Sequence, residues 1–280
     1  TVAALVGIAL VRFDPRGTFL SRLTFLGYSV VGDNVQYVPG RESNVVRLTG
    51  TFVEPNIAGL ILAVGLFVAI SSLTGIRRTI PAGIIGLGLL LTLSRAALGS
   101  VVVAALVLIV FSGGKRRWAL LGTAFAAGLA TLAIPTVRDR LLSSFGPNDT
   151  GSLMRSLAFR DFPGQLQGHW WWGLGWAREE FRDPVVGRTI NFVANAPLLT
   201  IYRGGLVLGG LCVLILVVIA LRSLFATQRT FSEAALASGV IGLSLVALQL
   251  DFPVVIQPPA TVVFSFLLGL ALHRPAQEET

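Results

Sequence analysis

Six long stretches of the chain are apolar and carry one charged residue between them, Glu233. A bilayer core about 30 Å thick is crossed by roughly 20 apolar residues in a helix, and most of the stretches approach that length. Only helices or a closed barrel satisfy backbone hydrogen bonds in lipid, and the stretches lack the alternation of barrel strands. The sequence therefore predicts an all-α, polytopic integral membrane protein. The stretches are Ile57–Gly75, Ala96–Gly113, Trp118–Val137, Gly204–Leu221, Phe231–Leu250 and Pro258–Leu272.

Composition supports this prediction and excludes several function classes. Only 13% of the residues are charged, against about 25% in soluble proteins, and the mean hydropathy is +0.77. The net charge of +8 comes from arginines scattered between the apolar stretches, without the clustered basic face of a nucleic-acid binder. We expect membrane lipids and no nucleic acid among the partners. Cys212 is the only cysteine, which excludes intrachain disulfides and cysteine-based metal sites.

The apolar pattern predicts about eight helices and two long connections, Phe13–Asn56 and Thr136–Asn195. The first helix, Val2–Arg12, is too short to span a bilayer and lacks the features of a signal peptide. We therefore expect a single transmembrane domain over residues 1–280 that is truncated at its N-terminus, with residues 136–195 as a long extracytoplasmic loop containing short amphipathic helices. The other expected helices are Ile57–Thr74, Ile80–Leu93, Ala96–Ser112, Trp118–Pro135, Pro197–Leu221, Phe231–Leu250 and Pro258–His273.

Basic residues in the short loops predict the orientation. Pairs and triplets such as Arg77–Arg78 and Lys115–Arg117 fall on one side if the helices alternate, and that side faces the cytoplasm. The long connections hold more arginines in total, but long loops carry little weight in this rule. Both long connections and the corner at Ser94–Arg95 are then expected to share the outer face, where residues far apart in sequence meet.

A polar segment, RLTGTFVEPN, leads into the second expected helix. Pro55 is tolerated in the first turn of a helix, and Glu54 or Asn56 can cap it. Capping leaves Arg47 unexplained, because a cation near a helix N-terminus opposes the helix dipole. An anion bound between the arginine and the exposed N–H groups would remove the conflict. The segment therefore indicates either an ordinary helix end or one wall of an anion site.

Two more arginines lie near helix ends on the same expected face. Arg95 follows a corner with almost no loop, where it can snorkel to headgroups or pair with an acid, or serve as a phosphate ligand on a rigid support. The helix after Asn195 and Pro197 carries Arg203 about two turns from its start. An arginine at that depth is expected to face protein or a water-filled pocket.

The second long connection contains the remaining candidate residues. Arg155 and Arg160 lie on a plausible amphipathic helix, and Gly173-x-Gly175 alone is a weak motif because no strand precedes it. His169 can pack at the interface or act as a base. Four tryptophans fit an interfacial aromatic belt better than a sugar-stacking platform. They are Trp170, Trp171, Trp172 and Trp176.

The order of these motifs resembles that of the O-antigen ligase / O-antigen polymerase-like family of bacterial membrane glycosyltransferases. The motifs are Arg-x-x-Gly-x-Phe-x-x-Pro-Asn from Arg47, a Ser-Arg corner, a long outer loop with an arginine and a Gly-x-Gly, and Asn-x-x-Leu before a Gly-Gly helix. The resemblance implies a multi-pass protein of the bacterial plasma membrane. It also implies transfer of glycan from a polyprenyl-diphosphate-linked oligosaccharide to a glycan or lipid acceptor on the extracytoplasmic face.

The resemblance also implies roles for particular residues and no metal or other cofactor. Arg47 and Arg95 match the family's arginines, and Arg155 matches its loop arginine. Together with Glu54 and His169, Arg47 and Arg95 form the expected catalytic set. The expected substrate-binding residues are Asn56, Arg155, Arg160, Asn195, Arg203, Gly173 and Gly175.

One departure concerns the base. The ligase branch has a histidine directly before the asparagine that ends the loop, and here Ala194 occupies that position. Either another group such as Glu54, Glu179 or His169 acts as the base, or the chain belongs to a polymerase-like branch, or it is inactive. Two further functions stay open: a transporter or flippase for an anionic substrate, and a non-catalytic member of a polysaccharide assembly complex.

Overall fold

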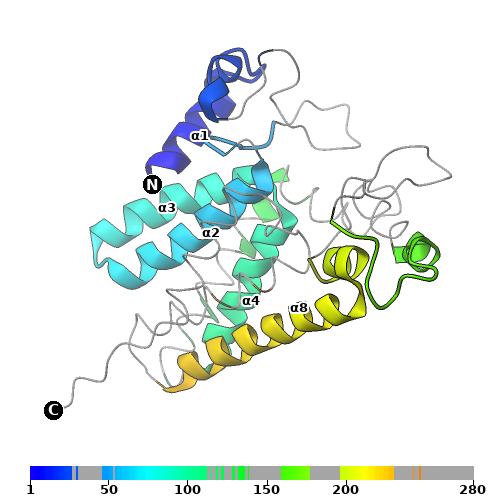
Figure 1. The fold of residues 1–280 in the computed structure, drawn as a ribbon. Coiled ribbons are helices and arrows are strands. Elements are labelled where there is room, and N and C mark those ends of the chain that lie inside the picture. Colours follow the sequence, from blue (N-terminus) through cyan, green and yellow to red (C-terminus); the bar gives the residue numbers. More distant parts are fainter. Residues whose placement is uncertain are drawn as a thin grey trace.

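The part of the chain that the computed structural model describes is helical and contains no strand (Figure 1). It comprises residues 1–26, 30, 46–52, 54–111, 159–176 and 196–229, with short pieces between 114 and 138 (114, 118, 121–122, 128–129, 132–135 and 138) and single residues at 242 and 246. The helices are α1 (Val2–Phe13), α2 (Pro55–Ser72), α3 (Ile76–Thr92), α4 (Arg95–Phe111) and α8 (Ala196–Arg229), with short 3₁₀ turns at Leu20–Arg22 and Thr24–Leu26.

Five of the expected helices fall in these ranges, and each coincides with an observed helix. The largest differences are at the start of α3, which begins four residues early at Ile76, and at the end of α8, which continues to Arg229. Of the expected helix Trp118–Pro135, only residues 118, 121–122, 128–129 and 132–135 are described. The expected helices Phe231–Leu250 and Pro258–His273 lie outside the described residues, apart from two single positions.

The eight expected membrane spans are not confirmed. Within the described residues, one helical segment is long and apolar enough to cross a membrane, Ala196–Arg222 of α8, whose most apolar 18-residue window has a mean hydropathy of 2.8. α2, α3 and α4 contain 18, 17 and 17 residues. At 1.5 Å per residue they reach about 26–27 Å, slightly less than the roughly 30 Å of a bilayer core.

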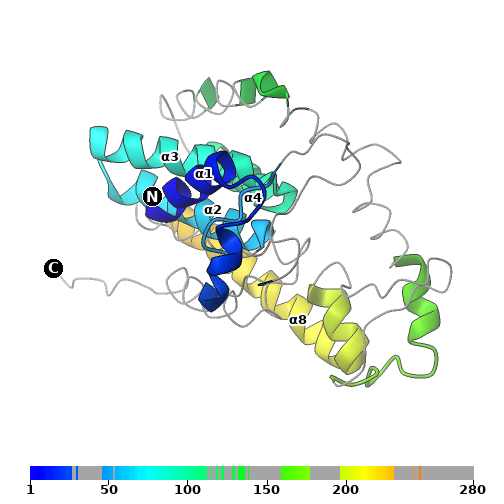
Figure 2. The same ribbon diagram turned by 90° about the horizontal axis from the view of Figure 1, so that it is seen from above.

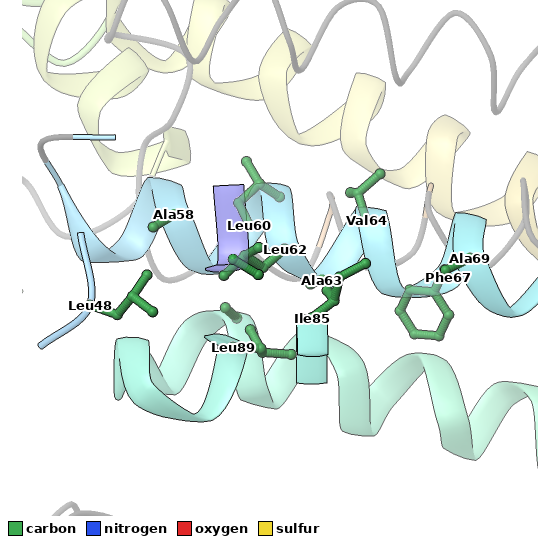
Figure 3. Close-up of a cluster of buried hydrophobic side chains, with 12 residues drawn as sticks. Leu48, Ala58, Leu60, Leu62, Ala63, Val64, Phe67, Ala69, Ile85 and Leu89 are labelled. Atoms are coloured by element: carbon green, nitrogen blue, oxygen red, sulfur yellow. The ribbon is translucent and has the colours of Figure 1, made fainter. Parts of the chain in front are cut away.

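The core lies between α2 and α3, and α1 packs against α3 (Figure 2). Figure 3 shows Leu62 and Ala63 of α2 directed toward Ile85 and Leu89 of α3, while Leu60 points away on the opposite side of α2. All five side chains are buried. Helix α2 is therefore covered on more than one side, which explains why its sequence is apolar all round.

Helix α8 is interrupted at Gly205, whose φ of 73° and ψ of −174° are not helical. This conformation is essentially restricted to glycine. Before the break, Leu199 and Tyr202 are buried; after it, most of the large apolar side chains are exposed. The single expected helix Pro197–Leu221 is therefore two helical segments with different surroundings.

Candidate functional site

Arg47 bridges the start of α2 and the end of α3. Its Nε donates a hydrogen bond to the main-chain oxygen of Thr92 at 3.0 Å, and its Nη2 donates to Oδ1 of Asn56 at 3.1 Å. A cation beside the last carbonyl groups of a helix is favoured by the helix dipole. From the sequence, a bound anion was expected to balance the charge of Arg47. In the structure, the carbonyl groups at the C-terminus of α3 provide a negative partner.

Asn56 links the charged groups of this region. Its Oδ1 accepts hydrogen bonds from Arg47 and from Oγ of Ser94 (2.9 Å), and its Nδ2 donates to Oε1 of Glu54 (2.9 Å). Glu54 is also the N-cap of α2 and accepts from the backbone N–H of Asn56, with Pro55 at the first helical position. The predicted capping is confirmed, and the same residues also hold Arg47.

The corner between α3 and α4 contains only two residues, as the sequence predicts. Leu93 adopts a left-handed conformation with a φ of 50°, which reverses the chain direction. Ser94 then begins α4, since its Oγ accepts from the backbone N–H of Ala97 at 3.4 Å. We name Arg47, Glu54, Asn56, Ser94 and Arg95 the polar corner.

Gly59 allows α2 to approach this corner closely. A Cβ atom at Gly59 would lie 2.7 Å from Cβ of Ala97 and 3.1 Å from Cβ of Ser94. The starts of α2 and α4 therefore converge. Two helix N-termini with their partial positive charges meet two arginines, Arg47 in contact with α2 and Arg95 at the first position of α4. Helix N-termini and arginines favour an anion, and the carbonyl of Thr92 and the carboxylate of Glu54 already supply part of that negative charge.

Ser94 is the site residue that sequence reasoning named only as part of a corner. Its hydroxyl both caps α4 and binds Asn56, so it joins three segments. A serine directly before an apolar helix is a recognisable capping position. Its link to Asn56, 38 positions away, depends on tertiary contact alone.

A second cluster forms where residues 169–176, the tryptophan loop, meet the break in α8. In an unbroken helix Leu206 N would donate to Tyr202 O; here it donates to Trp170 O at 2.8 Å. The carbonyl of Tyr202 instead accepts from Leu174 N at 2.8 Å. Similarly, Arg203 O accepts from Gly175 N at 3.0 Å. The loop thus satisfies the backbone groups that the break exposes, and we name this contact the α8 junction.

The two glycine motifs meet at the α8 junction. A Cβ atom at Gly173 would lie 2.6 Å from backbone atoms of Arg203, Gly204 and Gly205, and one at Gly205 would overlap the backbone of Trp171. Gly173 and Gly175 also have φ values of 68° and 91°. Gly173 therefore serves close backbone packing here.

The other predicted site residues of this region have different surroundings. Arg203 is half-buried, and its guanidinium lies 5.3 Å from the ring centre of Trp176, so it faces protein as predicted. Arg160 is exposed and pairs with the adjacent Asp161 at 2.8 Å. His169 is exposed and bonds through its backbone to Leu166 and Gly173.

The polar corner and the α8 junction lie toward the same end of the molecule. In both views α2 and α8 begin on the right and run leftwards (Figures 1 and 2). The structure thus brings Arg47, Glu54 and Asn56 together and places the α8 junction as a separate cluster. Arg155 and Asn195, also predicted as substrate-binding residues, lie outside the described residues.

Within the described part of the chain, no three His, Cys, Asp or Glu side chains gather closely enough to hold a metal ion. Comparison with known proteins finds no matching family, no similar curated protein and no similar solved structure.

Proposed function

We propose that this chain is a membrane glycosyltransferase of the O-antigen ligase or polymerase type. It would act at the extracytoplasmic face of the bacterial plasma membrane, in the synthesis of a cell-surface polysaccharide. The observation that carries the proposal is the polar corner, in which arginines and helix N-termini from distant segments converge at the end of an apolar helix layer.

Surface apolarity supports the membrane location. Leu214, Ile215 and Val218 of α8 expose 56%, 57% and 45% of their surface, and Val102 and Leu106 of α4 expose 56% and 54%. Soluble monomers rarely expose contiguous apolar patches of more than a few hundred Å². Exposed apolar helix surfaces of this kind are suited to contact with lipid.

The chemistry proposed for the polar corner is stabilisation of a diphosphate leaving group. The acceptor hydroxyl attacks the anomeric carbon of the donor sugar, the bond from that carbon to the diphosphate oxygen breaks, and the hydroxyl proton passes to a base. Charge then develops on the diphosphate. Preorganised donors at such a position contribute about 3–4 kcal/mol each, and Arg47 is preorganised by Thr92 and Asn56.

Glu54 is the base candidate that lies in the polar corner. Its Oε1 accepts from both nitrogens of Asn56, so its position is fixed. The substitution Glu54→Gln keeps an acceptor oxygen for Asn56 and removes the charge. We expect a loss of stability of no more than about 0.3–1 kcal/mol, from the charge removed at a helix N-terminus, together with loss of transfer. Retained transfer would limit Glu54 to its capping role and leave the base elsewhere.

Reconstitution tests the proposed function. The purified chain in vesicles receives a polyprenyl-diphosphate-linked oligosaccharide and an acceptor, and the expected result is a new glycosidic product. Arg95→Ala is expected to abolish the product without affecting insertion, whereas Arg77→Ala, on the exposed first turn of α3, leaves it unchanged. Full product from both Arg47→Ala and Arg95→Ala would contradict the diphosphate site.

One observation favours a second candidate, a transporter or flippase for an anionic substrate. Transporters commonly bind their substrates at interrupted helices, and α8 is interrupted at Gly205 beside Arg203. The same vesicles separate the functions, because a transporter moves the lipid-linked donor between leaflets and forms no glycosidic bond.

A further inference from the structure

We infer that Gly205 marks the level at which α8 enters the bilayer, and that the tryptophan loop anchors this boundary in the phospholipid headgroup region. The inference rests on the membrane location within the proposed function and adds a position and a partner surface to it.

The surroundings of α8 change at Gly205. Leu199 and Tyr202, before the break, are 2% and 3% exposed because they pack against Phe162 and Leu166. After it, most of the large side chains are exposed at positions spread around the helix, and only Leu216 and Ile219 are buried among the large side chains of residues 206–221. Those of Leu206, Val207, Leu208, Leu211, Val213, Leu214, Ile215, Val217, Val218 and Leu221 are 40–57% exposed.

The length of this exposed segment fits a bilayer. From Leu206 to Arg222 the helix rises about 26 Å at 1.5 Å per residue. That is slightly less than the roughly 30 Å of a hydrocarbon core. A helix with this small mismatch is accommodated when a flanking residue such as Arg222 snorkels toward the headgroups.

The break itself is suited to the interface. Non-helical backbone is costly in lipid unless protein or water satisfies its polar groups. At the α8 junction, Tyr202 O, Arg203 O and Leu206 N all bond to the tryptophan loop. The loop is thereby fixed at the point where exposed apolar surface begins, with Trp170 bonded directly to Leu206.

The tryptophans of the loop face outward. Trp171, Trp172 and Trp176 expose 67%, 79% and 59% of their surface. Tryptophan is enriched at membrane–water interfaces, where its ring is apolar and its N–H remains hydrated. Continuity with the exposed surface of α8 favours lipid over a glycan as the partner.

Cysteine labelling tests the boundary, because Cys212 is the only native cysteine. In a Cys212→Ala background, Gln167→Cys, Leu208→Cys and Leu214→Cys are placed singly in the full chain in phosphatidylcholine/phosphatidylglycerol vesicles. All three positions are exposed in the structure. A membrane-impermeant maleimide reaches both faces by freeze–thawing, so orientation does not affect the result. In vesicles we expect the cysteine at 167 to be labelled and those at 208 and 214 to be protected. In SDS, as the control, all three are labelled.

The other outcomes separate this inference from the proposed function. Labelling at 167, 208 and 214 together would contradict membrane insertion and with it the proposed function. Labelling at 208 but not 214, or protection of 167, would leave insertion intact and overturn the boundary at Gly205. If Leu208→Cys fails to fold, Val207→Cys replaces it.

Fluorescence quenching tests the lipid partner. A Trp118→Phe chain leaves only the four tryptophans of the loop, and its vesicles carry bromine either high on the acyl chain or near its end. We expect stronger quenching by the shallow bromine. Quenching by aqueous acrylamide alone would place the loop in water, and protection by added oligosaccharide without bromine quenching would assign the tryptophans to a glycan; either result overturns the inference.

Discussion

The polar corner and the α8 junction are built from different parts of the chain. In the polar corner, side chains make the connections: the guanidinium of Arg47, the amide of Asn56 and the hydroxyl of Ser94 join three helices. At the α8 junction, backbone N–H and carbonyl groups make them. The glycines there contribute mainly by allowing close approach.

This difference determines how each region can be studied. Removing one side chain of the polar corner leaves a buried or half-buried partner without its hydrogen bond. The resulting change in activity or stability can then be assigned to that one side chain. The α8 junction has few side-chain bonds to remove. It is disrupted by adding atoms, such as a Cβ at Gly173 or Gly205. The following predictions use this contrast.

Arg47→Ala is expected to have the largest combined effect on activity and stability, because it removes both a link between helices and a proposed diphosphate ligand. Transfer should fall by about 100- to 1000-fold, as for the loss of one preorganised donor. Stability should fall by about 1.5–3 kcal/mol, since a charged hydrogen-bond donor is lost. Product formation and thermal unfolding in detergent measure the two effects.

The matched variant Arg47→Lys keeps the charge but cannot bond both Thr92 and Asn56 in the same geometry. If Arg47→Lys is more stable than Arg47→Ala but remains inactive, Arg47 has a role in the reaction. If Arg47→Lys recovers both stability and activity, Arg47 is only a structural link.

Gly205→Ala should disrupt the α8 junction. Alanine at this backbone conformation costs about 1–3 kcal/mol, and its Cβ overlaps the backbone of Trp171. Thermal unfolding and the tryptophan emission maximum measure the change. Gly210→Ala is the control in the same helix, because its Cβ meets no atom within 4 Å. It should be neutral or slightly stabilising, and equal effects of both variants would contradict the junction.

Gly59→Ala should destabilise the polar corner by about 1–3 kcal/mol through overpacking. Its Cβ would lie 2.7 Å from Cβ of Ala97, whereas at Gly65 of the same helix the nearest atom lies at 3.9 Å. Gly65→Ala is therefore the control, expected to gain up to about 1 kcal/mol from helix propensity. Chemical denaturation in detergent compares the pair, and a stabilising Gly59→Ala would contradict the close approach of α2.

Among the four main variants, Arg47→Ala, Gly205→Ala, Gly59→Ala and Ser94→Ala, the last is expected to have the smallest effect on stability. It removes the cap of α4, which is worth about 1 kcal/mol, and the bond to Asn56. Ser100→Ala is the comparison within the same helix. The hydroxyl that it removes donates a hydrogen bond to the carbonyl of Ala97, three residues earlier. A smaller change is expected there. If Ser94→Ala affects transfer but not unfolding, the hydroxyl acts on substrate and not as a cap.

The helices themselves were predictable from sequence. Apolar length located α1 to α4 and α8, and Glu54-Pro55-Asn56 correctly marked the start of α2. These features depend on local chemistry, namely capping, proline geometry and the length of uncharged segments. The break at Gly205 was missed, because a glycine within an apolar run is also compatible with a continuous helix. The loop that stabilises the break is 29 or more residues earlier in the chain.

The candidate site was predicted in part. The sequence grouped Arg47, Glu54 and Asn56 on one face, and the structure brings them into one hydrogen-bonded group. It could not show that Thr92 and Ser94 complete the group. The interpretation of Arg47 also changed, since the sequence placed it beside one helix N-terminus and the structure adds the C-terminus of α3.

Within the described part of the chain, the sequence by itself determined where the helices are, because apolar length and capping residues act within a few positions of the chain. Only the tertiary structure decided which charges meet and where α8 is interrupted. Hydrogen bonds between segments, such as Ser94 with Asn56 or Leu174 with Tyr202, depend on distances in space. No local pattern in a single sequence specifies those distances.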